Sequence, residues 1–336
     1  MTVDDILSQI EALEPGLERA YLDTIRRTVD AVTLAEVERR LAEEDEQGLA
    51  ALLALGSLAT LAELVRSAYI AGARYEMAII TIPRSLRHQV GRLEFDQTRP
   101  PVEAWVASQV ADLRRQAADN VRDAIRAVVA SRRTVGGTLQ ARQAALDLLG
   151  RASPQTGQRV GGVLGMPGTV AKHVANARDQ LQSGDPAKLG AFLRRARRDR
   201  RQDGIVRRAI EAGRAVKDKD VERIVGRYSE RLMRTHVDLL AKNLAHESFN
   251  AGRQRAWEQL AEQGLPIEQI DKEWSDRADE KVRTSHRAMR GQRVGLREAF
   301  RAPSGVLLRF PGDSSLGAGY DETAGCRCIC IYHLKV

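Results

Sequence analysis

The feature that most constrains the fold is a long stretch, residues 218 to 263, whose apolar side chains recur at helical spacing. They are Val221, Ile224, Val225, Tyr228, Leu232, Leu239, Leu240, Leu244, Trp257 and Leu260. This period is typical of an amphipathic helix that turns one face to a core. Gly264 and Pro266 follow, and both residue types end helices. We therefore predict one long helix from Asp218 to Gln263.

Most of the remaining chain before residue 265 shows the same period. The aromatic content is only 4%, and Ala, Leu, Arg and Glu dominate, which suits long helices rather than sheets. We predict one helix or a broken pair over Leu17–Glu46, ended by Gly48, and further helices over Leu49–Ile80, Val102–Arg132, Leu139–Leu149, Val170–Gln182 and Pro186–Arg201, with a short one reaching Gly213. Pro83 and Pro100-Pro101 bracket a loop, and Gly157–Gly168 is a connector without the Gly-Lys-Ser/Thr ending of a phosphate-binding loop.

The pattern changes after Pro266. The runs Val306–Phe310 and Ile329–Leu334 are too short and too rich in β-branched or aromatic residues for helices. We predict strands there and one helix near Asp276–Met289. The predicted fold class is mainly α, with long helices in the first ~265 residues and a small C-terminal α+β domain. We divide the chain into an N-terminal helical region (1–150), a basic helical region (151–270) and the α+β domain (271–336).

Charge is distributed unevenly along the chain. Residues 1–150 carry 18 basic and 22 acidic groups, whereas residues 151–336 carry 35 and 23. This excess suggests contact with nucleic acid or with an acidic protein surface. The N-terminus lacks the pattern of a secretory signal, and the uncharged run Gln47–Ala62, at sixteen residues, is short for a membrane span. We expect a buried helix there and synthesis in a reducing cytoplasm.

The densest basic cluster lies in the middle of the chain. It consists of Arg194, Arg195, Arg197, Arg198, Arg200, Arg201, Arg207 and Arg208, with Arg214 following. On a helix, Arg194, Arg197, Arg198 and Arg201 would share one broad face while Phe192 and Ala196 point to a core. Such a face either binds phosphates or an acidic partner, or is simply solvated and partly neutralised by Asp199 and Asp203. Because no aromatic residues interleave, any DNA contact is expected at the backbone, without sequence preference.

Three cysteines alternate near the C-terminus, Cys326, Cys328 and Cys330. On a strand their thiols would share one face. With His286 or His333 they could bind zinc, they could form a disulfide, or they could be small buried hydrophobes. Ligands two apart on an extended strand lie roughly 6–7 Å apart, unlike the usual Cys-x2-Cys knuckle. We therefore favour buried thiols and predict no metal and no cofactor.

Polar residues elsewhere also invite a chemical interpretation. His286 with Asp279, Glu280 and Asp313 could act as acid and base if they converge, but Asp313 lies in a Pro-Gly-Asp turn where aspartate commonly caps its own backbone. We predict no catalytic residue. His236, Asn243, His246 and Asn250 fall on one stripe of the long helix. They either bind a partner helix or lie at the edge of a packed seam, which we favour.

The order of motifs over the last sixty residues carries a resemblance. The motif residues are Asp279, Val282-Arg283, His286, Gly291, Pro303, Phe310-Pro311-Gly312-Asp313, Glu322 and Cys326-Arg327-Cys328. This order resembles the C-terminal domain of phage Mu F-like head morphogenesis proteins, the minor head proteins of tailed phages. Upstream, Arg198-Asp199, Arg201, Asp203 and Asn250-Ala251-Gly252-Arg253 are similar to the helical region that precedes this domain in many members.

The sequence also departs from that family. Many relatives carry Ala-Arg-Thr-Glu where this chain has Ala241-Lys242-Asn243-Leu244, so the acidic residue is lost. Some members carry an upstream Cys-x2-Cys pair that would complete a four-ligand set for a metal. Here the matching segment is Val282-Arg283-Thr284-Ser285-His286, which lacks that pair.

The resemblance implies partners rather than substrates. We expect a virion component that is made in the host cytoplasm, present in multiple copies and built into the phage head near the portal vertex. Its expected partners are portal, scaffold or capsid protein and the backbone of packaged double-stranded DNA, with no membrane. The alternatives are a nuclease or other hydrolase using His286 and nearby carboxylates, and a membrane-active ejection protein using Gln47–Ala62.

Overall fold

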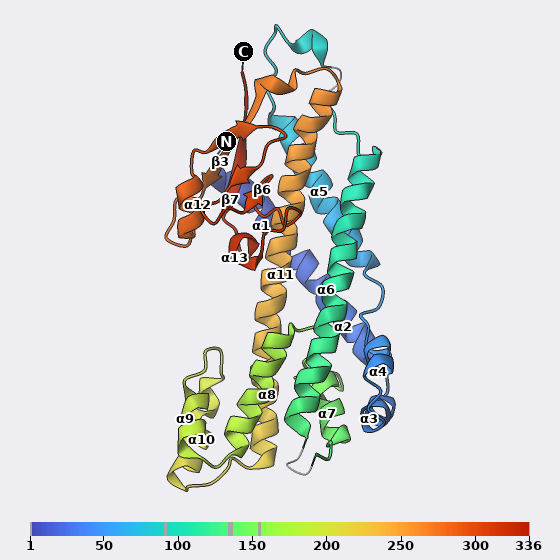
Figure 1. The fold of residues 1–336 in the computed structure, drawn as a ribbon, viewed down its shortest axis with the longest axis vertical. Coiled ribbons are helices and arrows are strands. Elements are labelled where there is room, and N and C mark those ends of the chain that lie inside the picture. Colours follow the sequence, from blue (N-terminus) through green and yellow to red (C-terminus); the bar gives the residue numbers. More distant parts are fainter. Residues whose placement is uncertain (1, 91–92, 134–136, 154–155, 336) are drawn as a thin grey trace. The chain divides into compact units, whose positions relative to one another are not determined.

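The computed structural model describes residues 2–90, 93–133, 137–153 and 156–335. The chain is mainly helical up to residue 262 and then forms a small α+β region, which confirms the predicted fold class (Figure 1). It divides into two compact units. The first unit comprises Met1–Ala20, Ala59–Gln109 and Asp238–Val336, and the second comprises Tyr21–Leu58 and Val110–Val237. Each unit is assembled from segments that are not consecutive. Our three-part division follows the order of the sequence and stays a prediction.

Most of the described chain before the α+β region is helical. The helices are α1 (Val3–Glu11), α2 (Glu14–Asp30), α3 (Leu34–Ala42), α4 (Glu46–Leu52), α5 (Ala59–Ile79), α6 (Pro100–Arg132), α7 (Ala141–Leu149), α8 (Gly168–Gln182), α9 (Pro186–Leu193), α10 (Asp203–Glu211) and α11 (Asp218–Glu262). Helix α11 confirms the long helix predicted from the apolar period. It contributes its N-terminal half to the second unit and its C-terminal half to the first.

Several helix boundaries differ from the prediction. The segment 49–80 is two helices, α4 and α5, because the chain leaves helical geometry at Leu53–Leu58, where the Gly56 N–H donates to Oγ1 of Thr28 (3.1 Å). Gly48 lies inside α4 instead of ending a helix, since Asp45 caps that helix by accepting its N–H. None of the described helices is both long and apolar enough to cross a membrane.

The helical core of the first unit depends on a close approach of α5 and α11. A Cβ added at Gly72 would overlap the carbonyl oxygen of Phe249, and one added at Gly252 would overlap that of Tyr69. The two backbones therefore touch through facing glycines, because any larger side chain would hold them apart. This contact explains the glycine of the Asn250-Ala251-Gly252-Arg253 run in packing terms.

The C-terminal region adds a three-stranded antiparallel sheet to the same unit, in the order β4-β3-β7. Its elements are η3 (Ile267–Gln269), β3 (Ile270–Asp276), α12 (Thr284–Met289), β4 (Arg293–Gly295), β5 (Phe300–Arg301), β6 (Leu307–Leu308), α13 (Tyr320–Thr323) and β7 (Cys328–Leu334). Strand β3 pairs along its whole length with β7, from Ile270 opposite Leu334 to Asp276 opposite Cys328. The two strands β5 and β6 form a separate hairpin.

The central strand β3 was missed from the sequence. Its buried positions alternate, but two of them, Lys272 and Asp276, are charged, so the apolar alternation that identifies a strand is broken. The helix expected over Asp276–Met289 is correspondingly short, because Asp276 ends β3 and α12 begins only at Thr284.

The second unit is built from α3, α4, α7–α10 and the parts of α2, α6 and α11 that belong to it. Strands β1 (Arg151–Ala152) and β2 (Arg159–Val160) pair antiparallel, and β2 lies inside the predicted connector Gly157–Gly168. A charge network ties four helices together: Asp147 of α7 accepts from Arg132 of α6 (2.7 Å) and Arg178 of α8 (2.9 Å), and Glu222 of α11 accepts from Arg178 (2.5 Å). Buried ions of this kind are tolerated when each charge is paired.

Candidate functional site

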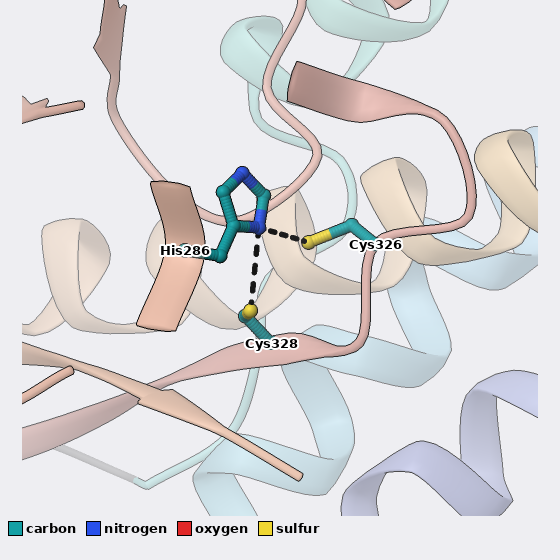
Figure 2. Close-up of side chains that lie close together, drawn as sticks. All are labelled: His286, Cys326 and Cys328. Atoms are coloured by element: carbon teal, nitrogen blue, oxygen red, sulfur yellow. Dashed lines mark hydrogen bonds between the residues drawn. The ribbon is translucent and has the colours of Figure 1, made fainter. Parts of the chain in front are cut away.

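Three side chains that are potential metal ligands meet inside the C-terminal region. His286 comes from α12, Cys328 begins β7 and Cys326 lies in the loop before it (Figure 2). Nδ1 of His286 lies 3.5 Å from Sγ of Cys326 and 3.4 Å from Sγ of Cys328. All three ligand atoms lie within 4.8 Å of one another. The side chains are buried, with relative exposures of 1%, 9% and 0%.

The convergence of the two thiols follows from where β7 begins. Cys326 precedes the strand, and Gly325 before it takes a φ of 59°, so the chain turns there. The two cysteines are therefore not spaced along one extended strand. Our argument from strand spacing against a shared site for these thiols does not hold, because it assumed that both lay on the strand.

The other side of the imidazole faces a carboxylate. Nε2 of His286 lies 3.1 Å from Oε2 of Glu322, within ion-pair distance although not aligned as a regular hydrogen bond. Glu322 is buried and accepts from Ser285 (3.0 Å) and Ser304 (2.8 Å), which fix its orientation. The sequence motif contained Glu322, but nothing in its spacing identified it as the partner of His286.

The two thiols titrate as a pair. Burial alone would raise the pKa of Cys326, but the hydrogen bond with Cys328 and the nearby His246 and His286 rings hold that pKa well below its ordinary value. The pKa of Cys328 is raised, first by its hydrogen bond with Cys326 and then by burial. Interacting groups release their protons in steps that belong to the pair.

Cys330 does not join this cluster. Burial raises the pKa of its thiol to about 12, and its nearest charges are Lys272 and Arg253. Lys272 is itself fully buried and donates to Oε1 of Gln254 (3.0 Å) and to the carbonyl of Arg309 (2.6 Å). Burial lowers the pKa of Lys272 to about 8. The surroundings of Cys330 fit the small buried hydrophobe predicted from the sequence.

The acid–base set that the sequence could have formed does not assemble around His286. Asp279 pairs with Arg327, and Asp313 accepts the N–H groups of Arg309 (2.8 Å) and Ser315 (3.1 Å). Among the described residues neither of these carboxylates, nor Glu280, forms a hydrogen bond or ion pair with His286. The Asp313 contacts are the turn-capping role expected from the sequence.

Other motif residues also serve local structure. Arg283 donates to the carbonyl of Ala324. Gly291 and Gly312 take φ values of 77° and 90°, the left-handed region that glycine adopts readily. Pro311 is buried beside Gly312, where an added Cβ would come 2.7 Å from Nδ1 of His246.

The polar stripe of the long helix connects α11 to the C-terminal strand. Asn243 accepts the N–H of Gly325 (2.8 Å), and His246 lies 2.8 Å from the carbonyl oxygen of Cys328. Asn250 donates to the carbonyl of His246 (3.0 Å). His236 belongs to the second unit, where it packs edge-on against Tyr21. Asn243, His246 and Asn250 satisfy their polar groups within one unit, which confirms the packed-seam interpretation for these three residues.

Arg253, next along the same helix, is fully buried in an ion pair. Its Nε donates to Oε2 of Glu76 (2.7 Å), and Nε1 of Trp257 donates to the other oxygen (2.8 Å). The guanidinium also lies over the ring of Tyr332, 5.5 Å from its centroid. This pair joins α5 to α11 beside the facing glycines.

The arginine-rich segment is not one helix, contrary to our prediction. Helix α9 ends at Leu193, Arg197 has a φ of 64°, and Asp199 caps the short 3-10 helix η2 (Arg200–Gln202) by accepting the N–H of Arg201. The shared helical face of Arg194, Arg197, Arg198 and Arg201 is therefore wrong. Phe192 is buried as expected, but Ala196 is exposed.

Part of this segment is neutralised within the second unit. Asp199 accepts from Arg201 (2.9 Å) and ion-pairs with Arg227 and Arg231, and the hydrogen bonds from Arg201 lower its pKa to about 2. Arg198 forms a bidentate pair with Asp203. Arg195 donates to Gln180, and Arg197 donates to Thr235.

Five arginines of the segment remain exposed and form no ion pair with any described residue. They are Arg194, Arg200, Arg207, Arg208 and Arg214, and we call them the unpaired arginines. Arg207 and Arg208 are adjacent on α10, which packs against α9. Neutralisation by Asp199 and Asp203 therefore covers only part of the cluster, and anion binding stays a prediction for the unpaired arginines.

No protein-family model, no curated protein and no solved structure matches this chain.

Proposed function

We propose that this chain is a structural component of a tailed-phage head, located near the portal vertex and bound to portal or capsid protein. The observation that carries the proposal is that polar residues of the C-terminal motif form their hydrogen bonds and ion pairs within the C-terminal region itself. Asp279 pairs with Arg327, Arg283 with a backbone carbonyl and Asp313 with its own turn. A motif used in this way defines a stable module for docking, whereas a hydrolase needs such groups directed at its substrate.

The unpaired arginines supply the second part of the proposal. Residues 190–215 contain nine arginines and three acidic residues, and the exposed, unpaired guanidinium groups are free to donate two parallel hydrogen bonds to a phosphate or carboxylate. Contacts of this kind are made to the DNA backbone and are insensitive to base sequence. The same groups would suit an acidic surface on a portal protein.

The head assignment is tested in particles of the phage or prophage that encodes the chain. Mature heads and precursor shells are purified on gradients, and mass spectrometry counts copies of this chain per portal ring. We expect a fixed ratio in at least one of the two particles. Absence from both would overturn the assignment, as would DNA or RNA cleavage by the purified protein that is lost in His286→Ala.

The DNA contact is tested separately by a salt titration with short duplex DNA. Each phosphate contact contributes about −0.9 to the slope of log K against log salt. Replacing Arg207 and Arg208 by glutamine should lower the magnitude of the slope by about 1.8 if each contacts one phosphate. A suitable control replaces Arg115 and Arg122, which are also exposed in the same unit but pair with Asp112 and Asp119.

The control variant loses the same two charges, so it measures the effect of net charge alone. Equal slopes in the two variants would mean that Arg207 and Arg208 contact no phosphate. No affinity for duplex DNA even at low salt would remove DNA from the proposal and leave the acidic protein surface as the partner.

A further inference from the structure

We propose that His286, Cys326 and Cys328 form a binding site for Zn²⁺, with one coordination position left to a water-sized ligand. The donor set is two thiolates and one imidazole. Zinc prefers these ligands, whereas magnesium and calcium prefer oxygen ligands. Two thiolates neutralise the charge of the ion, so the occupied site can be buried at low cost. The inference does not depend on the proposed head function.

The observed spacing matches a tetrahedral zinc centre. Bond lengths of about 2.0–2.1 Å to nitrogen and about 2.3 Å to sulfur place the two ligand atoms roughly 3.5 Å apart at the tetrahedral angle. Nδ1 of His286 lies 3.5 Å from the sulfur of Cys326 and 3.4 Å from that of Cys328. Figure 2 shows this nitrogen directed at both sulfurs. The nitrogen therefore already lies at the distance from both sulfurs that a shared zinc ion requires, and the two sulfurs lie within 4.8 Å of each other.

The residues around the site would orient its ligands. A zinc-bound histidine usually donates its other N–H to a carboxylate, which fixes the tautomer and the ring. Here Glu322 lies 3.1 Å from Nε2 and is held by Ser285 and Ser304, so Nδ1 is the nitrogen left to face the thiols. Trp274 is fully buried and packs edge-on against the His286 ring, with 5.0 Å between the ring centroids.

The described residues leave the fourth position open, because no further histidine, cysteine or carboxylate among them joins the three within the same radius. Cys330, the nearest candidate by sequence, is not part of this group. Three protein ligands with an open position are typical of zinc that keeps a water or exchanges a small ligand.

The test uses the full-length protein, purified without chelator and reconstituted with Zn²⁺ or with Co²⁺, whose absorption reports thiolate coordination. We expect one metal ion per chain by elemental mass spectrometry and a cobalt–thiolate band. Cys326→Ser and Cys328→Ser should lose both. Cys330→Ser is the matched control, since it removes another buried thiol from the same segment and should keep one ion per chain.

A milder variant keeps the test decisive if the cysteine variants do not fold. Glu322→Gln leaves all three ligands in place, and loss of such an outer partner should weaken Zn²⁺ affinity about 10- to 100-fold in a chelator competition. The proposal is overturned if the wild-type protein takes up no stoichiometric metal, if Cys326 and Cys328 are joined by a disulfide in the purified protein, or if Cys330→Ser loses the ion as well.

Discussion

The buried pair of Glu76 and Arg253 offers a stringent test of how the first unit is stabilised. Both side chains are at most 3% exposed, and Glu76 accepts from Arg253 and Trp257 at 2.7 and 2.8 Å. In Glu76→Gln the carbonyl can serve only one of these donors, and the amide N–H₂ faces the other. The guanidinium is then buried without a counter-charge, which typically costs about 3–5 kcal/mol.

The assay can be confined to the first unit. All three tryptophans, Trp105, Trp257 and Trp274, belong to it, so urea unfolding followed by tryptophan fluorescence reports on this unit. The control is Glu103→Gln, which breaks an exposed ion pair with Arg66 in the same unit and should cost about 0–1 kcal/mol.

A double variant distinguishes a lost attraction from an uncompensated charge. Glu76→Gln combined with Arg253→Met leaves an acceptor for Trp257 and removes the charge, so it should recover a large part of the free energy lost in Glu76→Gln. The reasoning is refuted if Glu76→Gln lowers the free energy of unfolding no more than Glu103→Gln does. It is also refuted if the loss in the double variant equals the sum of the losses in Glu76→Gln and Arg253→Met.

Three further predictions concern pH and packing. Burial raises the pKa of Glu247 from 4.5 to about 7. The free energy of unfolding of the first unit should therefore fall by about 3 kcal/mol as pH rises from about 4.5 to about 7. In urea titrations at pH 5 and pH 8, Glu247→Gln should show a smaller fall. Burial lowers the pKa of His236 from 6.5 to about 4. The second unit should therefore be most stable above pH 6.5 and lose stability toward pH 4. Acid unfolding followed by circular dichroism should be weaker in His236→Gln. Gly252→Ala should destabilise the first unit by about 2 kcal/mol or more, because its Cβ overlaps the Tyr69 carbonyl; Gly226→Ala, where an added Cβ has no neighbour, is the helical control.

The sequence by itself determined the elements that depend on local periodicity. The apolar stripe between residues 218 and 263 is sufficient to predict α11, because burial on one face and a 3.6-residue period describe the same structure. The loop before Pro100 and the strand at Ile329–Leu334 were likewise predicted from turn residues and β-branched runs. The basic composition of the middle segment also identified where unpaired positive charge occurs.

Only the tertiary structure decided which of these residues meet. Glu76 and Arg253 are far apart in the chain, and no local pattern pairs them. Strand β3 was not predicted because a buried lysine breaks its apolar alternation. Lys272 can be buried there only because the folded chain places Gln254 and the Arg309 carbonyl within hydrogen-bond distance. The contact of His286 with Cys326 and Cys328 depends on a turn at Gly325 and on the short α12, since a metal site is defined by distances that sequence spacing does not fix.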